Sequence, residues 1–512
     1  MVITDTKATA LLEPNLSKNI VGLPVTETVL KQLDPNLDLE IDQILKHYNV
    51  PGAGIAVVSD GQTYLKSYGV KDIKSNEPIS INTAFNIGST SKAFTSTITA
   101  ILVGEGLLDW DDPITQYVPE FELNDKWLTE NVTLRDLCGN RTGLTRSGFS
   151  EFASNTDIDV LDILSRLKYS KSEFGFRERF SYVNPGHIAV AVACSRVTGK
   201  DFVTLLSEKI WKPLGMNNSS GGKKAESDLC DISSWHCNWR GKCVSIDSTF
   251  ADNVLGSGGL CLSAKDAAHW LKFHLDKGIA NGKQVISESS LQETYSPQVI
   301  VRPEDIAPWI GTPDTKFAAY CLGWATSDFY GHRVIRHSGS DLGIQAQIAL
   351  VPDSGVGVSV YLNKKDSLAS LEINYLILGF LLGINKDWRA MLNQPLPDTG
   401  VQFERIEGLP QEKALLPLEN YAGMYFSHGD GIAEVSCNGE HLFVDFKLGS
   451  MYSSDLYPLG GHDFLPIARN PANEFNLRVR SQFTVEDDIA VKLFVPEVGE
   501  FHKLDEQVSS NE

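Results

Sequence analysis

The sequence predicts a mixed α/β (α+β) domain, one antiparallel sheet flanked by helices, followed by a small antiparallel β-barrel or sandwich. Strand patterns lie near both ends of the segment 25–390 with helical patterns between them, which favours one sheet covered by helices. After a tail at 1–24 and a linker at 391–415, the segment 416–512 shows short strands separated by turn residues. A chain of 512 residues is also too long for one small core.

The first elements are a helix and a hairpin. A helix is predicted over 25–48, interrupted near Pro35. Apolar stretches on both sides of Asp60-Gly61 span 54–68, and Asp-Gly between such stretches is typical of a tight hairpin turn. The first strands of the sheet are therefore expected here.

The remaining elements follow from the spacing of apolar residues. In the first domain they are a helix after Ser89, a mostly helical subregion over 134–214, a polar loop over 215–254, a helix over 264–275, a hairpin over 344–362 and a helix over 368–384. In the second domain they are strands over 421–425, 432–437, 442–446, 475–479, 483–485 and 489–495. The helix after Ser89 is expected to bury one face, because Phe94, Ile98 and Leu102 recur at helical spacing.

Composition and charge exclude several kinds of partner. The formal net charge of −20 argues against nucleic acid and against an anionic membrane surface. The longest apolar stretch, around 376–382, falls well short of the ~20 residues that span a bilayer. The sequence from Met1 lacks a basic region followed by an apolar one, so a cytoplasmic protein is expected. No phosphate-binding or dinucleotide fingerprint is present, and no cofactor is expected.

Three of the eight cysteines gather near a histidine. Cys230, Cys237 and Cys243, with His236 beside them, are spaced more widely than the cysteine pairs of structural zinc sites. An insertion loop without a metal is the expectation.

Ser89 and Lys92 carry the first chemical signal. They lie three positions apart at the start of a helix, so both side chains point from one face. A serine hydroxyl needs an adjacent base to become a nucleophile, and a lysine can be that base if its surroundings lower its pKa. The N–H groups at a helix N-terminus also favour developing negative charge.

Two further motifs follow in the same domain: Tyr182-x-Asn184 and His337-x-Gly339. In this order, and with supporting stretches at 141–144, 256–260 and 323–324, they resemble the serine β-lactamase and penicillin-binding protein superfamily. The likeness is to the branch that holds class C β-lactamases, D-alanyl-D-alanine carboxypeptidases, D-aminopeptidases, family VIII esterases and related acyltransferases. It covers roughly residues 30 to 385, and the tail from about Leu416 resembles a lipocalin-like domain.

The resemblance implies a role for each residue. Ser89 would form an acyl-enzyme with Lys92 and Tyr182 as its proton partners, and which of the two is the acylation base stays open. Asn184 would hydrogen-bond Lys92 or the substrate. The backbone N–H groups of Ser89 and Ser340 would form an oxyanion hole.

His337, expected in the catalytic group with Gly339 after it, departs from the family pattern. β-Lactamases of this branch usually carry lysine at this position, whereas similar histidines occur in the peptidase and esterase relatives. A histidine is only partly charged at neutral pH, so it would hold a substrate carboxylate less firmly.

Three functions remain open from the sequence. The first is a serine hydrolase acting on an ester or a small amide or peptide, and the second is an acyltransferase, transesterase or peptide cyclase that uses the same acyl-enzyme. The third hypothesis is that the protein is a β-lactamase or a binding protein without catalytic activity. The C-terminal domain would cover the cleft, bind a hydrophobic acyl chain, or mediate assembly into a homo-oligomer.

Overall fold

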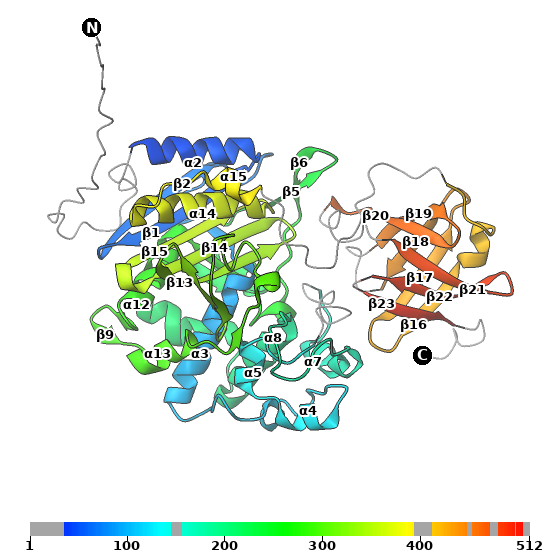
Figure 1. Ribbon diagram of the computed structural model, residues 1–512, viewed down its shortest axis with the longest axis horizontal. Coiled ribbons are helices and arrows are strands. Elements are labelled where there is room, and N and C mark those ends of the chain that lie inside the picture. Colours follow the sequence, from blue (N-terminus) through cyan, green and yellow to red (C-terminus); the bar gives the residue numbers. More distant parts are fainter. Residues whose placement is uncertain are drawn as a thin grey trace, which may run out of the picture.

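The computed structural model describes residues 35–144, 156–393, 412–447, 453–471, 480–496 and 498–504. Figure 1 shows a layered domain built on one sheet, and beside it a separate small barrel. The predicted tail at 1–24, most of the linker at 391–415 and the predicted strand at 475–479 lie outside the described residues.

The layered domain is organised around an eight-stranded sheet in the order β10-β11-β12-β13-β14-β15-β1-β2, in which every neighbouring pair is antiparallel. Its strands are β1 (Gly52–Ser59), β2 (Gln62–Gly69), β10 (Val299–Ile300), β11 (Ala318–Tyr320), β12 (Ala325–Phe329), β13 (His332–Asp341), β14 (Ile344–Val351) and β15 (Val356–Leu362). Smaller sheets are formed by β3 (Ala84–Asn86), β4 (Ser219–Gly221) and β7 (Leu260–Ser263), by β5 (Trp235–Trp239) with β6 (Lys242–Ile246), and by β8 (Ile279–Ala280) with β9 (Lys283–Gln284).

Both predicted hairpins are confirmed. Asp60 and Gly61 join β1 to β2 with φ of 50° and 73°, the left-handed conformation that a tight two-residue turn requires. β1 also pairs with β15, with Ile55 opposite Val360. The two ends of the domain's sequence therefore lie side by side in one antiparallel sheet, which confirms the predicted α+β fold class.

Helices cover both faces of the sheet, as Figure 1 shows. β1 is buried along its whole length, so its alternate side chains enter two cores. Ile55 and Val57 face a core with α2, α14 and α15, whereas Ala56 and Val58 face a core with α3 and α12. The helices of this domain are α2 (Pro35–His47), α3 (Ser91–Gly104), α4 (Lys126–Asn131), α5 (Leu134–Cys138), α7 (Val160–Ser165), α8 (Asn184–Thr198), α9 (Phe202–Leu206), α10 (Lys212–Leu214), α11 (Lys224–Asp228), α12 (Ala264–Leu275), α13 (Glu288–Thr294), α14 (Ser367–Leu382) and α15 (Trp388–Leu392).

Two sequence-based expectations about this domain are wrong in part. Every residue of α3 from Ser91 to Leu102 is buried, not one face only, because the helix lies between the sheet and the helical subregion. The segment 215–254 is not only a loop, since it contains β4, α11 and the hairpin β5–β6. Its polar composition hides short elements that are stabilised by tertiary contacts.

The second domain is a barrel rather than a sandwich. Eight strands close it: β16 (Gly423–Ser427), β17 (Gly431–Cys437), β18 (Leu442–Phe446), β19 (Ser453–Gly460), β20 (Asp463–Ala468), β21 (Ser481–Glu486), β22 (Ile489–Val495) and β23 (Gly499–Lys503). Aromatic rings from several strands, among them Tyr425, Phe464 and Phe501, fill the described interior. Small barrels are commonly packed in this way.

The barrel contacts the layered domain through two segments. Ile163 of α7 is fully buried in the same apolar cluster as the barrel's aromatic rings. Tyr169 stacks on His428, with ring centroids 5.8 Å apart. The hairpin β5–β6 reaches the barrel where the Cys237 thiol lies 3.4 Å from the Pro471 carbonyl oxygen.

Among the helices that the structure describes, none combines the length and apolarity needed to cross a membrane.

Candidate active site

Ser89 lies in a tight turn between β3 and α3. The turn is a single 3₁₀ turn over Gly88–Thr90, and Gly88 has φ of 50°. The Thr90 hydroxyl donates to the Ile87 carbonyl at 2.8 Å and the Ser91 hydroxyl to the Gly88 carbonyl at 2.6 Å. These two bonds hold the serine at the N-terminal end of a buried helix.

Lys92 stands one turn further on and is completely buried. Its Nζ lies 3.1 Å from Ser89 Oγ, 2.7 Å from Asn184 Oδ1 and 2.8 Å from the Ser257 carbonyl oxygen. The amide and carbonyl oxygens only accept, so they take two of the amine's N–H groups. The remaining position faces Ser89, where an ammonium donates and a neutral amine accepts the serine proton.

Tyr182 covers the same amine, since Lys92 Nζ lies 4.9 Å from the centroid of its ring. The segment that carries Tyr182 is held by Asn140, whose side-chain oxygen accepts from the Val183 N–H at 3.0 Å and whose carbonyl accepts from the Ser181 N–H at 2.9 Å. α8 then begins at Asn184, with Pro185 in its first turn. The structure thus brings Ser89, Lys92, Tyr182 and Asn184 together.

Gly339 and Ser340 meet the serine turn from β13. Pairing of β12 with β13 ends at Arg336, so the last part of β13 has its edge open to this turn. A Cβ on Gly339 would lie 1.9 Å from the Ile87 carbonyl oxygen and 3.1 Å from the Ser89 amide nitrogen, and a Cβ on Gly88 would lie 2.6 Å from the Ser340 amide nitrogen. The amide groups of Ser89 and Ser340 are therefore neighbours, as an oxyanion hole requires.

His337 is buried beside Tyr182, with ring centroids 6.1 Å apart. Its Nδ1 lies 2.6 Å from the Ser338 carbonyl oxygen and its Nε2 3.0 Å from the Tyr320 hydroxyl. Burial, together with the positive charge of Lys92, lowers the pKa of His337 to about 3. Burial also raises the pKa of Tyr320 well above its usual value. Trp309 packs on the imidazole at 5.0 Å.

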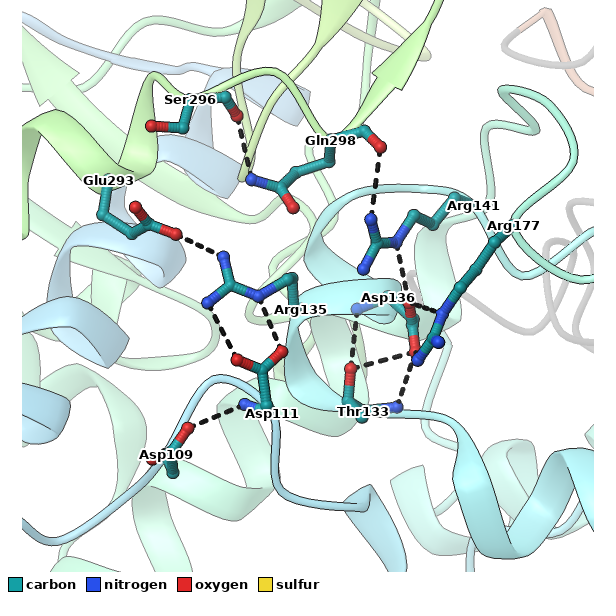
Figure 2. A network of polar contacts seen from close by, with 10 residues as sticks. All are labelled: Asp109, Asp111, Thr133, Arg135, Asp136, Arg141, Arg177, Glu293, Ser296 and Gln298. Carbon is teal, nitrogen blue, oxygen red and sulfur yellow. Dashed lines mark hydrogen bonds and ion pairs between the residues drawn. The ribbon is translucent and has the colours of Figure 1, made fainter.

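A buried ionic network supports the loop that carries Asn140 (Figure 2). Asp136 of α5 has a fully buried side chain that accepts from Arg141 at 2.7 Å and from Arg177 at 2.8 Å through both oxygens. Burial alone would raise the pKa of Asp136, but the bonds from Arg177 and the Thr133 backbone and the charge of Arg141 hold it below its usual value. This network links α5 to the segments before Leu144 and before Tyr182.

Sequence reasoning missed four residues of the site: Asn140, Ser257, Trp309 and Tyr320. Ser257 lies within the stretch 256–260 and Asn140 directly precedes the stretch 141–144, two stretches that the motif comparison singled out. Their contacts are made through backbone oxygens or across the fold, which leave no pattern in sequence. His187, which received no role, is buried one turn after Asn184, and burial with nearby Lys92 and His337 lowers its pKa well below the usual value.

Two of the three cysteines lie on the hairpin β5–β6. Cys237 pairs with Val244 and Cys243 with Asn238 across the hairpin β5–β6, so the two thiols are on opposite faces. His236 Nδ1 lies 2.8 Å from the Asn363 carbonyl oxygen, and its Nε2 accepts from the Ile73 N–H at 3.3 Å. Both ring nitrogens of His236 are thus engaged in holding the hairpin to the sheet.

Comparison with known proteins begins with a family model described as Beta-lactamase, which matches residues 37–379. Unguisins hydrolase ungD' of Aspergillus campestris is 26% identical in an alignment 428 residues long, which covers 78% of this chain and 77% of that protein. Unguisins hydrolase ungD of Aspergillus violaceofuscus is 25% identical over 79% of this chain and 76% of its own. Protein flp of Staphylococcus aureus is 25% identical over 63% of this chain and 62% of its own.

Two solved structures resemble most of the chain. The octameric penicillin-binding protein homologue from Pyrococcus abyssi has a TM-score of 0.59 at 22% identity, and the match covers 91% of this chain and 99% of that one. SurE has a TM-score of 0.55 at 18% identity, covering 93% of this chain and 100% of that one. At such identities the likeness shows the fold alone, in both domains.

Proposed function

The chain belongs to the beta-lactamase family, as its motifs suggested, and we propose that it is a serine hydrolase that acts through an acyl-Ser89 intermediate. Its substrate class is an ester or a small amide or peptide. The observation that carries the proposal is the position of Lys92 Nζ, which lies within hydrogen-bond distance of both Ser89 Oγ and Asn184 Oδ1.

Acylation begins with attack of Ser89 Oγ on the substrate carbonyl carbon. The serine proton passes to Lys92, whose third position faces Oγ, or to Tyr182, which lies against the same amine. The carbonyl oxygen becomes an oxyanion, which the N–H groups of Ser89 and Ser340 stabilise. Collapse breaks the bond to the leaving group, which takes up the proton.

Deacylation repeats these steps with water. Water attacks the acyl carbonyl and gives a proton to the same base, the bond to Ser89 Oγ breaks, and the proton returns to the serine. An amine or alcohol in place of water would make the protein an acyltransferase. The two Aspergillus relatives are named as hydrolases, which favours water as the acceptor here.

Intact-protein mass spectrometry tests this function. The full chain is incubated with p-nitrophenyl esters and with a fluorophosphonate, and each adduct is then chased with water, amines or alcohols. An adduct on Ser89 that is lost in Ser89→Ala supports the proposal. Ser165→Ala is the matched control, since it removes a partly exposed hydroxyl on α7 that bonds the Asp162 carbonyl. An adduct that survives in Ser89→Ala, or no adduct at all, would overturn the proposal, and faster release by amines than by water would favour acyl transfer.

A further inference from the structure

Both imidazole nitrogens of His337 are hydrogen-bonded. The Ser338 carbonyl oxygen can only accept, so the contact at 2.6 Å requires a proton on Nδ1. Nε2 then faces the Tyr320 hydroxyl at 3.0 Å. Tyr320 is fully buried in the cluster around Ala325 and Ile310, and a buried phenol keeps its proton. A phenol can donate or accept, but the lowered pKa of His337 keeps the imidazole neutral, so with the proton on Nδ1 the hydroxyl donates and Nε2 accepts.

The groups around His337 oppose a charge on it. A charge on Lys92 repels a second charge on His337, while Tyr182, Trp309 and Tyr320 present rings at 6.1, 5.0 and 5.9 Å between centroids. The two arginines shortly before Tyr182 are held by carboxylates: Arg177 by Asp136, and Arg179 by both oxygens of Asp305 at 2.7 and 2.6 Å. The position where β-lactamases of this branch carry a lysine thus holds an imidazole that is packed among aromatic rings and whose two nitrogens are already hydrogen-bonded.

We infer that Tyr320 is a positioning residue that holds His337 as the neutral Nδ1–H imidazole, so that the site around Ser89 selects acyl donors without a free carboxylate next to the scissile bond. The inference rests on the proposed function, because it concerns the substrate of the same serine. The substrate class becomes neutral esters and internal amide or peptide bonds. A carboxylate against this imidazole would lose its water without gaining a charged hydrogen bond from His337.

The first experiment reads the tautomer directly. The full chain is labelled with ¹⁵N-histidine, and the His337 signal is assigned by its loss in His337→Gln. We expect a protonated Nδ1 and a bare Nε2 throughout about pH 5.5–8, where an ordinary histidine titrates. Tyr320→Phe keeps the ring and removes the hydroxyl donor. In this variant His337 should show a second tautomer or should titrate within the same pH range. Tyr295→Phe is the matched control, because Tyr295 bonds a second buried histidine, His274, outside the site.

The second experiment compares two esters that differ only in the charge of the leaving group: phenylacetylglycyl lactate and phenylacetylglycyl lactamide. The wild-type protein should show the higher kcat/KM for the lactamide. His337→Lys should shift the ratio towards the lactate by about tenfold or more, through KM, because it adds a charge-assisted hydrogen bond. Tyr295→Phe should leave the ratio unchanged.

Three results would overturn the inference: a protonated Nε2 in the wild-type protein, an unchanged His337 signal in Tyr320→Phe, or a wild-type preference for the lactate ester. If Tyr320→Phe does not fold, the inference is still tested by the tautomer of His337 in the wild-type protein and by the ratio of kcat/KM for the two esters in His337→Lys. Fluorophosphonate labelling of Ser89 in the wild-type protein is a separate measurement. If Ser89 is not labelled, the proposed function is rejected. If Ser89 is labelled but the protein prefers the lactate ester, only this inference is rejected.

Discussion

Lys92 Nζ lies 2.7 Å from Asn184 Oδ1, although the two residues are 92 positions apart in the chain. One stands in the first turn of α3 and the other at the first position of α8, so the bond ties together the N-terminal ends of two buried helices. The proposed catalytic arrangement is thereby part of the core of the domain. Substitutions at the site are expected to change stability as well as chemistry.

Lys92→Met should slow labelling of Ser89 by a fluorophosphonate about 10²–10⁴-fold, the usual worth of a positioned proton acceptor. Rates are measured by quenched mass spectrometry. Lys364→Met is the matched control, because Lys364 is also buried but bonds the Tyr48 carbonyl on the opposite face of the sheet. It should lower the melting temperature and keep the labelling rate. Equal rates in the two variants would contradict a role of Lys92 in proton transfer.

Gly339→Ala should reduce kcat for an ester at least about 10²-fold, since its Cβ would meet the Ile87 carbonyl and displace the oxyanion groups. Gly355→Ala is the control. Gly355 has φ of 63° and open space around its Cα, so this variant should lose only about 1 kcal/mol of stability and no activity. Kinetics and thermal melts of both variants check the prediction, and unchanged kcat in Gly339→Ala would contradict it.

Asp136→Asn should destabilise the protein by about 3–5 kcal/mol at pH 7, because it leaves two guanidinium groups without their buried carboxylate. The exposed pair of Asp111 with Arg135 is the control, and Asp111→Asn should cost no more than about 1 kcal/mol. Chemical unfolding of the three proteins measures both changes.

The same carboxylate predicts a pH dependence. The pKa of Asp136 is lowered in the folded state, so its contribution is complete above the unfolded pKa of about 3.9 and is lost as the pH falls through the folded pKa. The gap in melting temperature between wild type and Asp136→Asn should therefore be constant at neutral pH and narrow below about pH 4. A gap that widens on acidification would contradict this assignment.

Ile163→Ala should destabilise the protein by about 2–5 kcal/mol, because Ile163 belongs to α7 yet is buried in the core of the barrel. Leu161→Ala, two positions away and only half-buried, should cost about half as much or less. Calorimetry should show that Ile163→Ala lowers the transition of the barrel while Ser89 labelling is retained. Similar losses in both variants would mean that α7 does not anchor the barrel.

The sequence alone identified most of the elements that carry the site. Asp60-Gly61 and the alternation over 344–362 specified two hairpins, because turn geometry and pleat period are local properties. The helix after Ser89 and the helix over 264–275 were likewise expected from apolar spacing. The order of Ser89-x-x-Lys92, Tyr182-x-Asn184 and His337-x-Gly339 pointed to the family and to four side chains that the fold brings together.

Only the tertiary structure decided how those side chains are paired. The bonds from Lys92 to the Ser257 carbonyl, from Val183 to Asn140 and from Tyr320 to His337 join segments far apart in the chain. Such contacts depend on the packing of buried surfaces, which no local spacing encodes. The charge of His337 is decided in the same way, since a histidine is neutral or charged according to its burial and its neighbours.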